Sequence, residues 1–218
     1  MTWRPTLCHH GKLMKKEVNG TGLFKKIKDA FTGEELMHDL CAHLQALGIH
    51  ATLLASGSPD AIGPRWKKGP FISESVLGNI KIDGHNLDLL VVGRRSEGGG
   101  EDTSGGIVHP YFYVVRAPVE GLEKRLDAKS KSIRKGFFSK DVTDLQWEGG
   151  DLAQQLNADA DLKAMTLSTG LVGLEVRPDK TNRCVRILGY PGLPSREHFD
   201  LYDRIAHYIR IITGPRPR

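Results

Sequence analysis

The sequence predicts an α+β fold in which a largely antiparallel β-sheet packs against a C-terminal amphipathic helix and two or three further helices. Two observations predict this class. The expected elements run helix, strand, hairpin, strand, strand, helix, hairpin and helix, an order that does not fit regular βαβ alternation. In addition, residues 195–213 carry the clearest helical periodicity of the chain, with an apolar half that needs a sheet to cover it.

The N-terminal part predicts an irregular arm followed by two helices. Residues 1–20 have no sustained period, so we expect an arm there and a single domain over 21–214. Residues 22–31 predict a short amphipathic helix with a basic face, and packing is favoured over contact with a membrane surface because such short helices are usually held by packing. A longer helix is expected from Gly33 to Leu47, followed by Gly48 in the left-handed conformation.

The middle of the chain predicts most of the sheet. Strands are expected at 49–55, 76–82, 87–94, 108–117 and 142–147. Asp83–Asn86 has the composition of a hairpin turn, and Val108–Ala117 is expected to be buried on both sides. The glycine-rich stretch 97–106 is the point at which two lobes would separate. The segment that follows at 122–126 is expected to be partly helical.

The C-terminal part predicts a broken helix, a hairpin and the final helix. Asp151 can begin a helix whose period falters near 157–161, where Asp159 is expected to cap the restart. Strands are expected at 171–177 and 183–188, around a turn at 178–182. 

The final helix is expected to begin after Ser195, a good N-cap residue, and to pack one face on the sheet. Ile205 and Ile209 should be nearly inaccessible to solvent, whereas Arg204 and His207 should face it. His198 falls within the apolar arc, and we interpret it as a core histidine with its hydrogen bonds satisfied rather than as a catalytic base.

Composition indicates a soluble cytoplasmic protein. The chain of 218 residues is 39% apolar and 26% charged, which is ordinary for a globular domain. Three widely spaced cysteines do not make a secreted disulfide framework, and no apolar run is long enough for a signal peptide or a membrane span. The net charge of +5 permits anionic partners without requiring them.

No catalytic or cofactor motif occurs in the sequence. We therefore expect no cofactor, and the sequence favours a protein that is not an enzyme. The nucleophile elbow, the zinc-protease motif, the phosphate-binding loop and the dinucleotide fingerprint are all missing. The leading hypothesis is therefore a binding or regulatory module without catalytic chemistry, whose partner is a protein or a polyanion. An enzyme with dispersed active-site residues would look the same in one sequence and stays open as an alternative.

The basic segment 124–140 is the strongest functional signal and predicts binding to nucleic acid or another polyanion. Residues 123–140 contain seven lysines or arginines and two acids, so their net charge equals the +5 of the whole chain. The candidate residues are Lys124, Arg125, Lys129, Lys131, Arg134, Lys135, Phe137, Phe138 and Lys140. Cations beside aromatic rings are typical of single-stranded nucleic acid binding. The competing interpretation, which we favour, is a solvated loop that its two phenylalanines anchor to the core.

Metal binding is a weaker hypothesis and rests on Cys8, His9 and His10. Thiolate and imidazole suit zinc, but contiguous residues rarely converge on one ion and no fourth ligand is evident. His38, Cys41 and His43 do not converge on a helix, so Cys41 is interpreted as a core residue.

Overall fold

The computed structural model describes residues 33–63, 74–96, 107–134, 142–189 and 192–214. All of these residues belong to one compact unit, Gly33–Arg218. The arm predicted at 1–20, the helix predicted at 22–31 and the glycine-rich stretch 97–106 lie outside the described residues.

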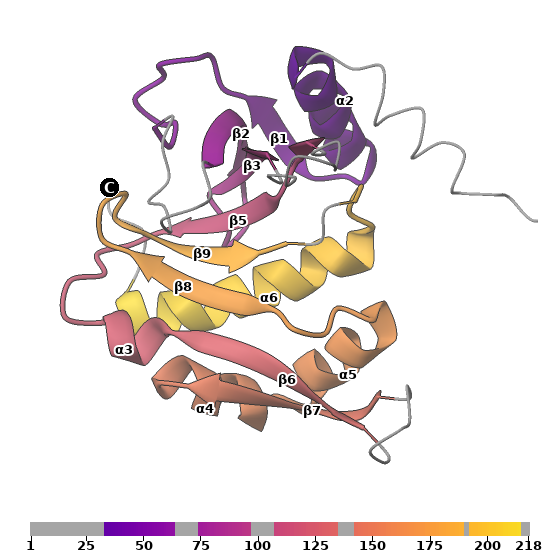
Figure 1. Cartoon of the computed structure of the whole chain (residues 1–218), viewed down its shortest axis with the longest axis vertical. Helices are drawn as coiled ribbons and strands as arrows, with labels where there is room; N and C mark the ends of the chain where they lie inside the picture. Colours follow the sequence, from indigo (N-terminus) through magenta and orange to yellow (C-terminus); the bar gives the residue numbers. More distant parts are fainter. Residues whose placement is uncertain (1–32, 64–73, 97–106, 135–141, 190–191, 215–218) are drawn as a thin grey trace, which may run out of the picture. The chain divides into compact units, whose positions relative to one another are not determined.

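One antiparallel sheet contains all the strands of the described residues. They are β1 His50–Leu53, β2 Glu74–Asp83, β3 Leu89–Ser96, β4 Ile107–Val108, β5 Tyr111–Arg116, β6 Ala128–Arg134, β7 Val142–Gly149, β8 Glu175–Asp179 and β9 Cys184–Leu188. Their order across the sheet is β1-β2-β3-β5-β9-β8-β6-β7, and the short β4 pairs with the end of β3 (Figure 1). The predicted α+β class with a largely antiparallel sheet is confirmed.

The longer helices cover one side of this sheet. The helices of the described residues are α2 Gly33–Ala46, α3 Glu123–Leu126, α4 Asp151–Ala158, α5 Ala160–Thr169 and α6 Arg196–Thr213. The buried residues of α2, α4, α5 and α6 join alternate strand residues in one hydrophobic cluster, to which Tyr113 and Val115 of β5 and Ile187 of β9 contribute. We call this the helix-covered side.

The second side of the sheet carries a smaller hydrophobic cluster over its central strands. That cluster consists of Ile62, Leu89, Val91, Phe112, Val114 and Cys184. Asn79 of β2 fixes Ile62, because its side chain accepts the Ile62 N–H at 3.0 Å and donates to the Ile62 carbonyl at 3.3 Å. Part of the loop after β1 therefore packs against this side.

The final helix has the predicted bounds and the predicted buried face. The Ser195 hydroxyl accepts the His198 N–H at 3.2 Å and so caps the first turn. Ile205 and Ile209 are completely buried, as expected. Burying each of these side chains contributes roughly 1.5 to 3 kcal/mol, so the face anchors the helix strongly.

Two predictions about the surface of α6 are wrong. Arg204, expected to face solvent, donates to Asp159 at 2.6 and 2.8 Å. His198, expected in the buried arc, is half-buried in the first turn, where its Nδ1 accepts the Ser195 N–H at 3.3 Å. Helical periodicity shows which way a side chain points but not which other elements pack beside the helix. Here α5 packs against the part of α6 that was expected to face solvent. His207 is exposed as predicted.

The predicted break in the preceding helix is confirmed. Residues 151–169 form α4 and α5, and Asp159 caps the second because its carboxylate accepts the Leu162 N–H at 3.0 Å.

The strand expected at 171–177 is observed further along the chain as β8, with bounds Glu175–Asp179. The alternating residues before it form a turn, since Gly173 has a φ of +81° and Val172 is 42% exposed. Pro178, expected in the following turn, lies within the strand. It is tolerated because β6 pairs with β8 only at 175–176, which leaves β9 as the neighbour of Pro178.

The basic segment contains a strand, β6, that the sequence did not predict. Its inward positions on the helix-covered side are small or polar, and Ser130 is only 1% exposed. The Ser130 hydroxyl accepts the Leu174 N–H at 2.8 Å, which satisfies this buried polar group. Hydrophobic alternation therefore gave no signal for a strand that is held by hydrogen bonds.

Candidate functional site

A row of cations lies on the second side of the sheet, next to its hydrophobic cluster. Residues paired in register lie on the same side of a sheet. Arg116 pairs with Cys184 between β5 and β9, Arg186 pairs with Arg177 between β9 and β8, and Glu175 pairs with Lys129 between β8 and β6. Alternation along each strand then places five cations on this side, which we call the cationic face: Arg116, Lys129, Lys131, Arg177 and Arg186.

Glu175 lies at the centre of the cationic face and contacts two of its members. Its carboxylate accepts a hydrogen bond from Lys129 at 2.6 Å and lies 2.8 Å from Arg177. The hydrogen bond from Lys129, with the charge of Arg177 beside it, holds the pKa of the Glu175 carboxyl below its usual value. The Glu175 side chain is 23% exposed, against 54% for Lys129 and 62% for Arg177.

The other acids of the face differ in their exposure. Lys131 lies 2.5 Å from Glu148, and Arg186 lies 3.6 Å from Asp179. The Lys131 and Glu148 side chains are about equally exposed, at 56% and 51%, whereas Arg186 and Asp179 are 20% and 6% exposed. Four of the five cations therefore share three acids, and the Arg116 guanidinium donates to the Asp60 carbonyl.

A groove of about 440 Å³ lies where β6 and β8 diverge, at one end of the cationic face. It is lined by Glu123, Lys124, Asp127, Gly149, Gly150, Arg177 and Pro178. Arg177 thus belongs to both the groove and the cationic face. Gly150 allows the β7–α4 turn to approach α3, because a Cβ there would lie 1.9 Å from the Lys124 carbonyl oxygen.

The groove contains charges of both signs. The Glu123 carboxylate lies 2.5 Å from Lys180, and Arg125, which follows Lys124, lies 2.6 Å from Asp151. Lys124 itself is exposed and has no ion-pair partner among the described residues. The groove is therefore not strongly charged.

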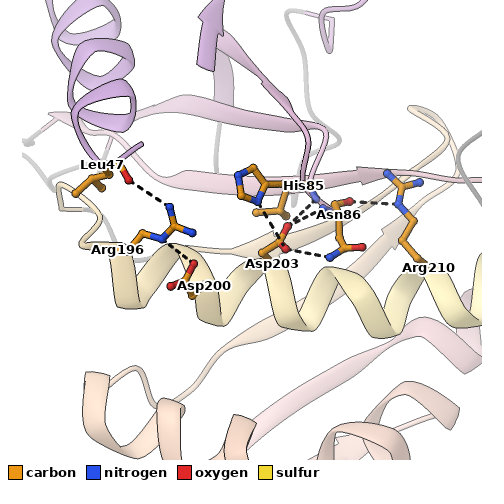
Figure 2. A network of polar contacts seen from close by, with 8 residues as sticks. Leu47, His85, Asn86, Arg196, Asp200, Asp203 and Arg210 are labelled. Carbon is orange, nitrogen blue, oxygen red and sulfur yellow. Dashed lines mark hydrogen bonds and ion pairs between the residues drawn. The ribbon is translucent and has the colours of Figure 1, made fainter. Parts of the chain in front are cut away.

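A second polar cluster lies between α6 and the β2–β3 turn, and Figure 2 shows how its side chains meet. Asp203 accepts the backbone N–H of Asn86 at 2.7 Å and its side-chain amide at 2.9 Å. His85 lies 3.9 Å from the same carboxylate and packs edge-on against Phe199. These contacts join the hairpin turn to the helix.

Further along α6, Arg210 binds the end of the same hairpin. Its guanidinium donates to the Asp88 carboxylate and, at 2.7 Å, to the Arg116 carbonyl. Asp88 also accepts the Arg116 N–H at 2.6 Å. Each of these charged groups has hydrogen-bond partners that hold α6 to the sheet, so the cluster is structural in its geometry.

The sequence-predicted polyanion residues divide into described and undescribed groups. Lys124, Arg125, Lys129, Lys131 and Arg134 are exposed on α3 and β6, and three of them, Arg125, Lys129 and Lys131, have acidic partners. Lys135, Phe137, Phe138 and Lys140 lie outside the described residues, as do the predicted metal ligands Cys8, His9 and His10. 

No three metal-ligating side chains converge within the described ranges. The described helices include none that is long and apolar enough to cross a membrane. Cys184 lies beneath the second side of the sheet, where burial raises the pKa of its thiol to about 12, so it is not a candidate nucleophile.

Sequence reasoning missed three arginines of the cationic face, namely Arg116, Arg177 and Arg186. Each falls at an outward position of a strand, but the sequence could not show that β9 and β8 lie between β5 and β6. The available signal was the alternation of residues 184–188, in which Arg186 follows buried Val185 and precedes buried Ile187. No protein-family model matches this chain, nor does any curated protein or solved structure.

Proposed function

We propose that the chain is a binding module without catalytic chemistry of its own, and that it binds an anionic partner through the cationic face. One observation carries the proposal: Lys129, Lys131 and Arg177 are each more than half exposed on the same side of the sheet. An approaching anion therefore meets lysine and arginine first. Ion pairs of exposed groups contribute little to stability, so a partner can contact these three cations at small cost.

The cationic face extends beyond the basic segment 124–140. Lys129 and Lys131 come from that segment, whereas Arg116, Arg177 and Arg186 come from strands that the fold brings beside it. Arginine suits this role because its planar fork can bind carboxylate or phosphate through two hydrogen bonds.

The test is binding to a generic polyanion, such as a heparin oligosaccharide, by the intact chain. Replacing Lys129, Lys131 and Arg177 by glutamine should weaken binding and lower the salt dependence of affinity by about one unit of slope per cation. Lys81→Gln is the matched control, since Lys81 is 43% exposed on the same side of the sheet but lies on β2. Absence of binding at about 50 mM salt, or equal binding by the triple variant, would reject the proposal.

A further inference from the structure

The cationic face is poor in the residues that anchor protein partners. The large apolar side chains exposed in the described part of the chain are Ile133, Val172 and Ile211, and of these only Ile133 lies on a strand of the face. Protein interfaces are usually held by aromatic or aliphatic anchors at their centre. Interfaces with nucleic acid are more polar and more positively charged. The composition of the face fits the second kind of partner.

The row of cations is long enough to contact more than one phosphate. Neighbouring strands lie about 4.8 Å apart, so the row from β5 through β9 and β8 to β6 spans roughly 14 Å. Successive phosphates of one DNA strand rise about 3.4 Å along the duplex axis, and they lie further apart in space than this rise because the strand also winds around the axis. A row of this length can therefore contact more than one phosphate of a strand.

No exposed tyrosine, phenylalanine or tryptophan occurs among the described residues, so this part of the face offers no ring on which a base could stack. Phe112 is only 7% exposed and lies under Arg186, whose guanidinium carbon is 5.9 Å from the ring centre. Single-stranded nucleic acid is usually bound by stacking bases on such rings. A paired duplex needs no such ring, since it presents its phosphates with the bases already stacked.

We infer that the cationic face binds the phosphate backbone of double-stranded nucleic acid without reading its base sequence. The inference rests on the proposed function and names its partner. Contacts from lysine and arginine to phosphate fix position on the duplex but carry no sequence information. Two duplexes of equal length and different sequence should then bind alike.

The experiment measures fluorescence anisotropy of a short labelled DNA duplex titrated with the intact chain. A duplex of scrambled sequence, a single strand of the same length and a poly-glutamate peptide are the comparison probes. Binding should be strongest for the two duplexes, and the slope of log affinity against log salt should fall by about three in the Lys129→Gln, Lys131→Gln, Arg177→Gln variant. The Lys81→Gln variant should keep the full slope, and circular dichroism should show that both variants are folded.

Other results separate this inference from the proposed function. Tighter binding of the single strand, or preference of about tenfold or more for one duplex sequence, would overturn the inference but leave an anionic partner in place. If the protein bound poly-glutamate but not the duplex, the inference would likewise be overturned, and the anionic partner would be an acidic protein. Binding of no probe at low salt would overturn both.

Discussion

Asp159 joins α5 to α6 through hydrogen bonds to its carboxylate. Its carboxylate caps α5 and also accepts hydrogen bonds from Arg204 and from the Tyr208 hydroxyl, which lies 2.9 Å away. Only 4% of the Asp159 side chain is exposed. A buried carboxylate is costly unless its oxygens are satisfied, so removing a donor leaves an uncompensated charge.

Replacing Arg204 by alanine should therefore destabilise the protein by about 1 to 3 kcal/mol, the range for a hydrogen bond to a charged group. Urea unfolding followed by circular dichroism measures the loss. His207→Ala is the control on the same helix, and its exposed side chain should give a change within about 0.5 kcal/mol. Equal effects of the two substitutions would show that the Arg204 contact adds nothing.

Asp159 should also give the protein an acid-sensitive component of stability. Burial alone would raise the pKa of its carboxyl, but the hydrogen bonds from Arg204, the Leu162 N–H and Tyr208 outweigh burial and leave the pKa below its usual value. A carboxyl whose pKa is lower in the folded state stabilises the protein fully above its unfolded pKa, near 3.9. That stability is lost as the pH falls through the folded pKa.

The Asp159→Asn variant keeps a capping side chain but cannot titrate. Its free energy of unfolding, measured in urea across the acid range, should be lower than that of the wild type at neutral pH. The difference should shrink below about pH 4 as the wild-type carboxylate is protonated. Curves that stay parallel down to the lowest pH would contradict this role.

At the scale of elements, a side-chain amide from a helix binds backbone groups at one position on each edge strand of the sheet. Gln45 of α2 donates to the Ala51 carbonyl of β1 at 2.8 Å. Asn157 of α4 accepts the Trp147 N–H of β7 and donates to the Trp147 carbonyl, both at 2.8 Å. Unpaired backbone groups on an edge strand can pair with another chain, and these amides occupy them.

Asn157→Ala should therefore promote self-association, because β7 would present its free N–H and C=O groups at Trp147. Light scattering after size-exclusion chromatography over a range of concentrations would detect the larger species. Gln154→Ala, an exposed change on the same helix, should leave the wild-type profile. A monodisperse Asn157→Ala protein with the wild-type mass would show that the edge is protected by other means.

The buried face of α6 gives the strongest stability prediction. Ile205→Ala and Ile209→Ala should each lower the free energy of unfolding by roughly 2 to 5 kcal/mol, as large-to-small changes in a packed core do. Ile211 lies on the same helix but is 56% exposed, so its alanine variant should cost no more than about 0.5 kcal/mol. Similar urea midpoints for all three variants would mean that α6 contributes little to the core.

At the scale of the whole molecule, α6 closes a hydrophobic core that spans most of the sheet. Its buried residues share one cluster with residues of every strand from β1 to β7 in the order of the sheet. Ending the chain after Pro194 should expose that surface and produce an aggregating protein. A soluble fragment 1–194 that melts cooperatively would identify α6 as an appendage and its apolar face as a docking surface.

Much of this fold could be predicted from the sequence because its helices carry local signals. The periodicity and Ser195 cap of α6, and the Asp159 cap between α4 and α5, need no knowledge of distant residues. The strand β6 could not be predicted, since its buried Ser130 is held by a partner, Leu174, that lies far along the chain. Of the cationic face, only the two lysines could be predicted. Its three arginines come beside them only through the order of the strands in the sheet, which the sequence does not show.

The strand order also has a consequence for the time course of folding. β8 and β9 follow the other described strands along the chain, yet they lie between β5 and β6 and join the two parts of the sheet. Before they are synthesised, the strands that precede them can pair only as two separate sets, with β5 and β6 as unpaired edges. Pairing across long sequence separations is slow, and open edges invite wrong partners in the meantime. Insertion of the β8–β9 hairpin between these two edges is thus the step that joins the two sets of strands into one sheet.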